Sequence, residues 1–322
     1  MKPVFPSVRR PGAALSRGFS LLEMLIGIGI LSVVVLALYA LFDQTQKALR
    51  ANVNQVDVSE GGRSVLDLLV RDVMRAAASG INTNYVVDRR GDIVRTVPPG
   101  TNLVVIHTKG GLFEGPWEGV FGDQNRRKSA LHELFYLIEP QPGRWLGAGL
   151  FVAGENPQDT VDGLGTLWRY EDTDPLGARG VKGADDISLL NNRFLNNTAY
   201  RTNHVSRLID GVVFFRVTPF GPQGQPLDDT YLTETNRVVP RDVIIGSTRY
   251  DSPLKIDGTF FKNQMLPSAI EIELGILPTQ LVDQYRSMDV PAVRNRFLTN
   301  NAPNVLVFRQ RIPLPAAPAP LP

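Results

Sequence analysis

The chain contains no cysteine and only three histidines among its 322 residues. The absence of cysteine excludes disulfide bonds and cysteine-ligated metal sites. The three histidines, His107, His132 and His204, leave little for a histidine metal centre or a catalytic triad. The sequence also lacks GxxxxGK[ST], HExxH and GxSxG motifs, which mark nucleotide-binding, zinc-peptidase and hydrolase sites. We therefore expect a protein that is not an enzyme and has no cofactor.

The chain also lacks a strong excess of positive charge. Its formal net charge is +2, with 34 basic and 32 acidic residues. Four of the basic residues, Lys2, Arg9, Arg10 and Arg17, lie in the first 18 residues, which contain no acid. Without these four charges, the rest of the chain has a formal charge of −2. A nucleic-acid-binding protein with a broad basic face is therefore not expected.

One long apolar run is nearly free of charge. Between Phe19 and Phe42 the only charged residue is Glu23. A helix of about 24 residues spans about 36 Å, which is enough to cross the hydrocarbon core of a bilayer. Because the basic residues precede the run, the positive-inside rule places the N-terminus in the cytoplasm and the rest of the chain across the inner membrane.

Two ordinary interpretations explain this run incompletely. A secretory signal peptide has a shorter apolar region, about 7–15 residues, and a small-residue cleavage site, which this run lacks. A simple signal anchor explains the length and the charges, but not Glu23. A carboxylate inside a membrane is costly unless it has a partner, so Glu23 is predicted to be functional.

The segment RGFSLLEMLIGIGIL (17–31) resembles the N-terminus of type IV prepilins and of type II secretion pseudopilins. The resemblance implies that residues 1–18 are a basic leader, which prepilin peptidase removes by cutting between Gly18 and Phe19. It also implies that the new N-terminus, Phe19, is N-methylated. Glu23 then becomes the fifth residue of the mature chain. The family assigns this glutamate to assembly, where it neutralises the N-terminal amine of a neighbouring subunit.

The helical pattern continues beyond the membrane run. Residues 43–80 are amphipathic, with Leu66, Leu69 and Val73 at helical spacing. The pair at 79–80, Ser-Gly, predicts the end of this spine helix. Glycines 61 and 62 interrupt the pattern and predict a kink or a short break.

After residue 80 the pattern changes from helix to strand. The predicted strands lie at 85–97 (two short strands), 102–108, 132–139, 166–170, 208–220, 269–277 and 304–314, and a short helix is predicted at 279–288. The strand at 269–277 alternates apolar and acidic residues, which predicts one buried and one wet face. The predicted fold is α+β and pilin-like, with the long N-terminal helix packed on an antiparallel sheet.

The predicted organisation has five parts. They are a leader (1–18), a membrane helix (19–42), a spine helix (43–80), a periplasmic head (81–314) with a loop-rich insertion at about 110–205, and a proline-rich flexible tail (315–322). Acidic clusters at 171–174, 185–186 and 228–229 leave calcium binding open, although EF-hand spacing is absent.

Three further segments resemble the J-type pseudopilins of type II secretion (GspJ) and the PilW-type minor pilins. They are LVRDVMRA (69–76), LIDGVVFFRV (208–217) and LPSAIEIELGI (266–276), the last followed by VLVFRQRIPLP (305–315). The resemblance implies a structural minor subunit that helps to start or cap a pseudopilus or a type IV pilus. The implied partners are other minor pilins or pseudopilins, contacted through the N-terminal helices, together with an inner-membrane assembly platform and the membrane lipid.

Two other functions stay open at this point. A minor pilin with the same anchor can act as an adhesin or in DNA uptake, with a ligand bound by the 110–205 region. A membrane-anchored periplasmic enzyme would require titratable groups gathered in a pocket.

Overall fold

The computed structural model describes residues 20–78, 101–107, 131–141, 144–173, 194, 202–227, 242–249, 255–262 and 265–315. The chain divides into two compact units, Met1–Val53 and Asn54–Pro322. The predicted processing residues Gly18 and Phe19, the strand pair at 85–97 and the Ser79–Gly80 cap lie outside the described residues. Most of the proline-rich tail lies outside them as well.

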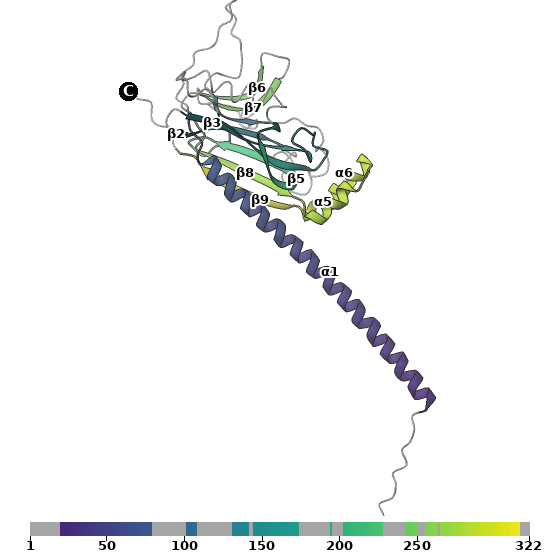
Figure 1. Cartoon of the computed structure of the whole chain (residues 1–322). Coiled ribbons are helices and arrows are strands. Elements are labelled where there is room, and N and C mark those ends of the chain that lie inside the picture. Colours follow the sequence, from purple (N-terminus) through teal and green to yellow (C-terminus); the bar gives the residue numbers. More distant parts are fainter. Residues whose placement is uncertain are drawn as a thin grey trace, which may run out of the picture. The chain divides into compact units, whose positions relative to one another are not determined.

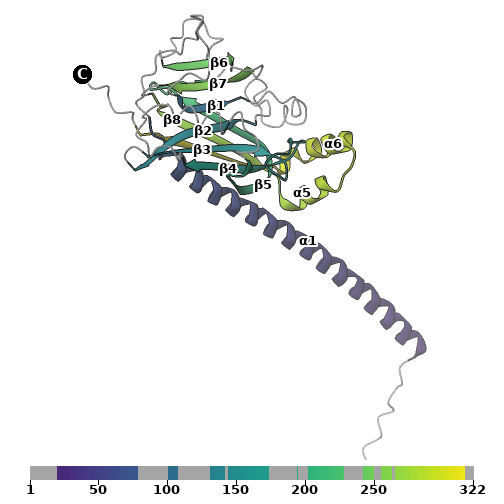
Figure 2. The ribbon, with the colours of Figure 1, turned by 45° about the horizontal axis from the view of Figure 1, so that its top comes forward.

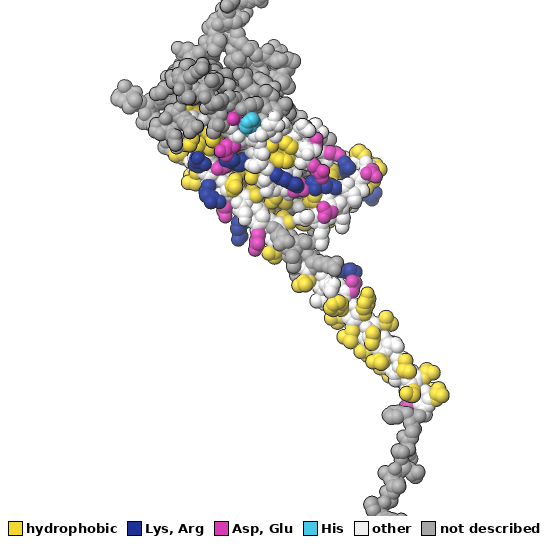
Figure 3. Space-filling view, in the orientation of Figure 1, with side chains coloured by type: hydrophobic (Ala, Val, Ile, Leu, Met, Phe, Trp, Pro, Cys, Tyr) yellow, Lys and Arg dark blue, Asp and Glu magenta, His cyan; other side chains and the backbone are white. Residues whose placement is uncertain are grey.

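Helix α1 (Leu21–Val73) is 53 residues long and contributes residues to both units. Within its first part, Leu21–Leu49, the most apolar 18-residue window has a mean hydropathy of 2.7 and no buried residues. Apolar side chains cover this part of the helix in Figure 3. Length and composition therefore make Leu21–Leu49 a candidate membrane span, as predicted for the apolar run.

The second unit is built on a nine-stranded sheet whose neighbouring strands are all antiparallel (Figures 1 and 2). The strands are β1 (Thr101–Ile106), β2 (Glu133–Gln141), β3 (Arg144–Ala153), β4 (Gly165–Thr173), β5 (Val205–Phe220), β6 (Val243–Arg249), β7 (Lys255–Lys262), β8 (Ala269–Ile276) and β9 (Leu306–Pro313). Their order in the sheet is β6-β7-β1-β2-β3-β4-β5-β8-β9. A long helix and an antiparallel sheet confirm the predicted α+β class.

The sheet is buried on both faces around β1. On one face, side chains from β1, such as Leu103 and Val105, form a core with Leu69 and Val73 of α1. On the other face, the alternate β1 residues join a second apolar cluster, in which Phe194 contacts the aromatic rings of the sheet. This explains why β1 reads as a continuous apolar run and is buried at all six positions.

Three short helical segments close one end of the second unit. They are α5 (Thr279–Arg286), α6 (Pro291–Asn301) and the 3-10 helix η3 (Ala302–Asn304). Pro291 occupies the first position of α6, where its missing N–H leaves no helical hydrogen bond unmade. Tyr285 of α5 and Leu298 of α6 are buried, and they form a third apolar cluster with Val213 of β5. The position of α5 agrees with the helix predicted at 279–288.

Helix α1 departs from the sequence prediction in two ways. It ends at Val73, before the predicted end near residue 80, because the chain then turns and Ala77 N–H donates to Leu137 O of β2. The helix is also unbroken at Gly61 and Gly62, so the predicted break is wrong. A Cβ at position 62 would lie 2.4 Å from Cζ of Phe308, so this glycine allows β9 to approach the helix closely.

Several strands were not predicted, and their position changes the interpretation of residues 110–205. Strand β3 was not predicted, and with the predicted strands β2 and β4 it forms the middle of the sheet, so residues 131–173 belong to the sheet. Residues 110–130 and most of 174–201 lie outside the described residues. A Cβ at Gly149 would lie 2.6 Å from Cε2 of Phe194, so this glycine makes room for a packed ring. Strands β6 and β7 and helix α6 were also missed.

The predicted wet face of β8 is also corrected. Glu273 is buried, although the alternating pattern placed it in water. Its carboxylate lies 3.9 Å from Nη1 of Arg216 on β5 and 3.3 Å from Nε of Arg309 on β9. Because β8 lies between two strands that carry arginines, its acidic residues are paired across the sheet.

Candidate functional site

The N-terminus of α1 is closed by two side chains that bond reciprocally. The backbone N–H of Glu23 donates to Oγ of Ser20 at 3.2 Å, and the backbone N–H of Ser20 donates to Oε2 of Glu23 at 3.3 Å. The Ser20 hydroxyl also lies 3.4 Å from the same carboxylate oxygen. This arrangement is a capping box, which satisfies N–H groups that the first turn of a helix leaves without partners.

The capping box gives Glu23 a local role that the sequence interpretation missed. The signal was present, because Ser20 and Glu23 form the S-x-x-E spacing directly before an apolar run. A carboxylate in the first turn is also favoured by the helix dipole. Among the described residues, Glu23 Oε1 has no hydrogen-bond or ion-pair partner, so one oxygen of this carboxylate remains available.

The apolar part of α1 satisfies its own polar groups. The Ser32 hydroxyl donates to Ile28 O at 2.8 Å, and the Thr45 hydroxyl donates to Leu41 O at the same distance. Hydrocarbon offers no hydrogen-bond partners, so hydroxyls that bond back to the helix lower the cost of burying this segment in a membrane. Glu23, at the start of this segment, is the only acidic residue before Asp43, so its carboxylate is the one charged group in the apolar part of the helix.

A separate pocket in the second unit is the place where an enzymatic site would be sought. Its volume is about 330 Å³. It lies between the β3–β4 connection and helices α5 and α6, and is lined by Gly154, Glu155, Asp159, Thr160, Asp162, Leu164, Tyr285, Arg286 and Arg294. Its two arginines and three acids are drawn from segments far apart in the sequence.

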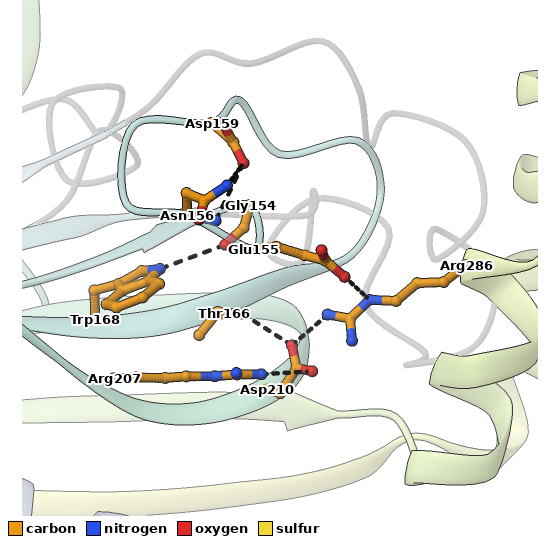
Figure 4. A network of polar contacts seen from close by, with 9 residues as sticks. All are labelled: Gly154, Glu155, Asn156, Asp159, Thr166, Trp168, Arg207, Asp210 and Arg286. Carbon is orange, nitrogen blue, oxygen red and sulfur yellow. Dashed lines mark hydrogen bonds and ion pairs between the residues drawn. The ribbon is translucent and has the colours of Figure 1, made fainter.

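The charges around this pocket are engaged with one another (Figure 4). Arg286 of α5 lies 2.9 Å from Oε1 of Glu155 and 2.8 Å from Oδ1 of Asp210. Asp210 also accepts a hydrogen bond from Thr166 and pairs with Arg207, each at 2.9 Å. The network therefore fastens α5 to β4, β5 and the β3–β4 connection.

Arg294 of α6 makes a second set of such contacts. Its Nη1 lies 2.6 Å from Oδ2 of Asp162, and its Nε donates to Met288 O at 2.6 Å. The Tyr285 hydroxyl donates to Asp162 O, and burial, together with the Asp162 charge, raises the pKa of Tyr285 to about 12. We interpret these charged groups as structural, because their ion pairs and hydrogen bonds attach α5 and α6 to the rest of the second unit.

The remaining candidates for chemistry were the histidines and the acidic clusters. The rings of His107 and His132 lie 4.8 Å apart, and burial first, then the neighbouring His107, lowers the pKa of His132 to about 3. Within the described residues, no group of three or more His, Asp or Glu side chains is placed to hold a metal. Of the acidic clusters, Glu171 pairs with Arg169, whereas residues 174, 185–186 and 228–229 lie outside the described part.

Residues 14–39 match the family model of the prokaryotic N-terminal methylation motif. The match contains the predicted cleavage site and the Ser20–Glu23 capping box. It supports a type IV pilin-like or pseudopilin-like protein, and the candidate membrane span Leu21–Leu49 is consistent with an inner-membrane anchor for such a protein. No curated protein and no solved structure matches the chain. The match covers only the N-terminal segment, so it says nothing about a J-type or PilW-type head.

Proposed function

We propose that this chain is a structural minor pilin or pseudopilin that helps to start or cap a type IV pilus or a type II secretion pseudopilus. The single observation that carries the proposal is the start of α1. There, a methylation motif, a capped glutamate and an exposed apolar helix of 29 residues coincide. An exposed apolar helix of this length requires a membrane or other apolar helices around it.

The covalent chemistry of processing fits the capping box. Cleavage between Gly18 and Phe19 places a positively charged amine on Phe19, and the Phe19–Ser20 peptide bond stays intact. The Ser20 N–H can therefore still bond Glu23 after cleavage. The uncommitted oxygen, Oε1, is then the acceptor for the amine of a neighbouring subunit. In hydrocarbon, the Phe19 amine and the Glu23 carboxylate are each costly to bury unless they pair with an opposite charge. Pairing between neighbouring subunits therefore favours assembled subunits over separate ones.

The second unit supports a position at the end of a fibre. It comprises residues 54–322, and its nine-stranded sheet and two added helices make it bulky. A subunit that repeats along a fibre must fit against copies of itself at every step, whereas a subunit at the tip is free of that requirement. The choice between a pilus and a secretion pseudopilus then depends on the partner subunits.

The first experiment is intact mass measurement and N-terminal sequencing of the native protein extracted from membranes. The expected chain begins at Phe19 and is about 14 Da heavier than its sequence mass, because of one added methyl group. A matched Gly18→Val variant should keep its leader and remain unmethylated. A native chain that still begins at Met1 would overturn the proposal and leave a simple membrane anchor.

A further inference from the structure

Strand β9 (Leu306–Pro313) is an edge of the nine-stranded sheet. In the part of the chain that the structure describes, β9 has β8 on one side and no strand on the other. Its pairing with β8 continues without a register shift from Ala269–Pro313 to Ile276–Leu306. A long and regular edge strand presents a row of backbone N–H and C=O groups with which another strand can pair.

The hydrogen bonds next to β9 identify which of its backbone groups face away from the sheet. Leu314 N–H donates to Ser268 O, just before β8, at 3.1 Å. Backbone groups alternate in direction along an antiparallel strand, so the even-numbered residues of β9 bond β8 and the odd-numbered residues turn their N–H and C=O outward. Pro313 has no N–H and ends this row. The other outward residues, all exposed, are Val307, Arg309 and Arg311.

One positive charge on this edge strand is not neutralised by the described residues. The guanidinium of Arg309 lies 2.7 Å from Oε1 of Glu271 and 3.3 Å from Oε1 of Glu273. The guanidinium of Arg311 instead lies over the ring of Phe220, 3.9 Å from its centroid, and has no acidic partner in the described part of the chain. Strand β9 itself contains no acid. Charged side chains on an edge strand disfavour pairing with an arbitrary strand, so these arginines would select an acidic one.

We propose that β9 binds an extended, acidic segment of a different protein, which adds to the sheet as a strand antiparallel to β9. An acidic residue of that segment lies opposite Arg311, and an apolar residue four positions later lies opposite Val307, which is 44% exposed. The antiparallel orientation continues the pattern of the sheet and is slightly more stable per residue than the parallel one. Antiparallel pairing with the β9 of a second copy would place Arg309 opposite Arg309, so charge disfavours that pairing.

Disulfide tethering of a short peptide tests this pairing, because the chain has no cysteine of its own. The detergent-solubilised full chain would carry Asn304→Cys, at an exposed position just before β9. The probe is an acetylated peptide, Thr-Glu-Thr-Thr-Thr-Val-Thr-Gly-Gly-Cys-amide, equilibrated with the protein in a glutathione redox buffer. The tether raises the effective concentration of the peptide, so a weak contact becomes measurable. The linked fraction should be several-fold higher with this peptide than with one that has lysine in place of glutamate.

Methylation of single peptide nitrogens distinguishes strand pairing from ionic contact alone. In the proposed register, the N–H of the peptide's valine donates to β9, whereas the N–H of the threonine before it points away. A methyl group on the valine nitrogen should therefore reduce the linked fraction several-fold, and one on that threonine nitrogen should change it little. Equal effects of the two methyl groups would contradict the addition of a strand.

A substitution in the protein tests the selection by charge. Arg311→Gln should abolish the preference for glutamate over lysine, whereas Arg296→Gln on exposed α6 should preserve it. An unchanged preference in Arg311→Gln, equal linkage of all peptides, or a disulfide dimer of the protein formed in place of the peptide adduct would overturn the proposal. The assay uses the purified chain and does not depend on cleavage at Gly18, so its result is independent of the proposed function.

Discussion

Phe308 of β9 packs against Gly62 of α1 so closely that an added Cβ would meet three atoms of the ring, the nearest at 2.4 Å. At the adjacent Gly61, the nearest atom to an added Cβ is Cδ1 of Ile209, at an ordinary 3.6 Å. Two neighbouring glycines in one helix therefore have different reasons to be there. Only Gly62 is required by packing.

This difference predicts opposite effects for the same substitution. Gly61→Ala should stabilise the protein by about 0.5–1 kcal/mol, because alanine favours the helix. Gly62→Ala should destabilise it by about 1–3 kcal/mol, because the ring of Phe308, which is partly buried against the core, must move. The measurement is urea unfolding of the detergent-solubilised chain. The double variant Gly62→Ala with Phe308→Leu should recover part of the loss, and a stabilising Gly62→Ala would contradict this packing.

The last turn of α1 is fastened to the sheet by a largely buried ion pair. Asp72 and Arg169 of β4 are 13% and 16% exposed at their side chains, and Arg169 also contacts Glu171. Burial alone would lower the pKa of Arg169, but its hydrogen bonds and the two acidic charges outweigh burial and raise it. The arginine therefore stays charged while its partners are ionised.

Removing this arginine should be costly. Arg169→Met leaves Asp72 buried without its partner, which should lower the free energy of unfolding by roughly 3–5 kcal/mol. Arg207→Ala removes a half-exposed partner of Asp210 and should cost less than about 1 kcal/mol. Denaturant unfolding of both variants provides the comparison. Adding Asp72→Asn to Arg169→Met should restore part of the loss, and equal costs for the two arginines would rule out a special role for Asp72.

The sequence predicted those parts of the fold that depend on local pattern. The apolar helix, the strand at 208–220 and the alternating strand at 269–277 are long and periodic, and the structure contains all three. The prepilin-like motif around Glu23 could likewise be identified from the sequence alone. The capping role of Ser20 could have been found, because its spacing to Glu23 is a local signal.

The parts that were missed depend on contacts between distant residues. Gly149 of β3 is explained by Phe194, and Gly258 of β7 by Val105 O, which an added Cβ would approach to 2.4 Å. Neither contact can be read from the residues around the glycine. Glycine within these two strands marks close packing in the sheet, which the local sequence does not show.

The buried His132 predicts a dependence of stability on pH. Its pKa falls from about 6.5 in the unfolded chain to about 3 in the folded protein, so the folded state favours the neutral ring. Its contribution is complete above pH 6.5 and is lost as the pH falls towards 3, by at most about 1.4 kcal/mol per pH unit. The ring also accepts a hydrogen bond from the backbone N–H of Val217 at 3.1 Å.

The test is urea unfolding at several pH values between 7 and 4. His132→Asn supplies an uncharged acceptor for the Val217 N–H and should flatten the dependence of stability on pH. His204→Asn, which makes the same replacement at another histidine, serves as the control variant. If the wild-type chain and His132→Asn lose stability equally on acidification, another group is responsible.

The capping box allows the two roles of Glu23 to be separated. Glu23→Gln keeps a side-chain oxygen for the Ser20 N–H, since glutamine also serves in a capping box, but it removes the negative charge. Ser20→Ala does the reverse, because it removes the cap, at about 1 kcal/mol, and keeps the charge. If Glu23 pairs with the amine of a neighbouring subunit, assembly should fail in Glu23→Gln and persist in Ser20→Ala.

Both variants should still lose the leader at Gly18, which N-terminal sequencing of the membrane fraction verifies. The readout for assembly is the amount of surface pilus or pseudopilus recovered from cells that carry each variant. The opposite result, normal assembly in Glu23→Gln and failure in Ser20→Ala, would assign Glu23 to the local cap alone. The carboxylate at the membrane would then be explained by the folding of one chain, because Ser20 and Glu23 satisfy each other without any neighbour.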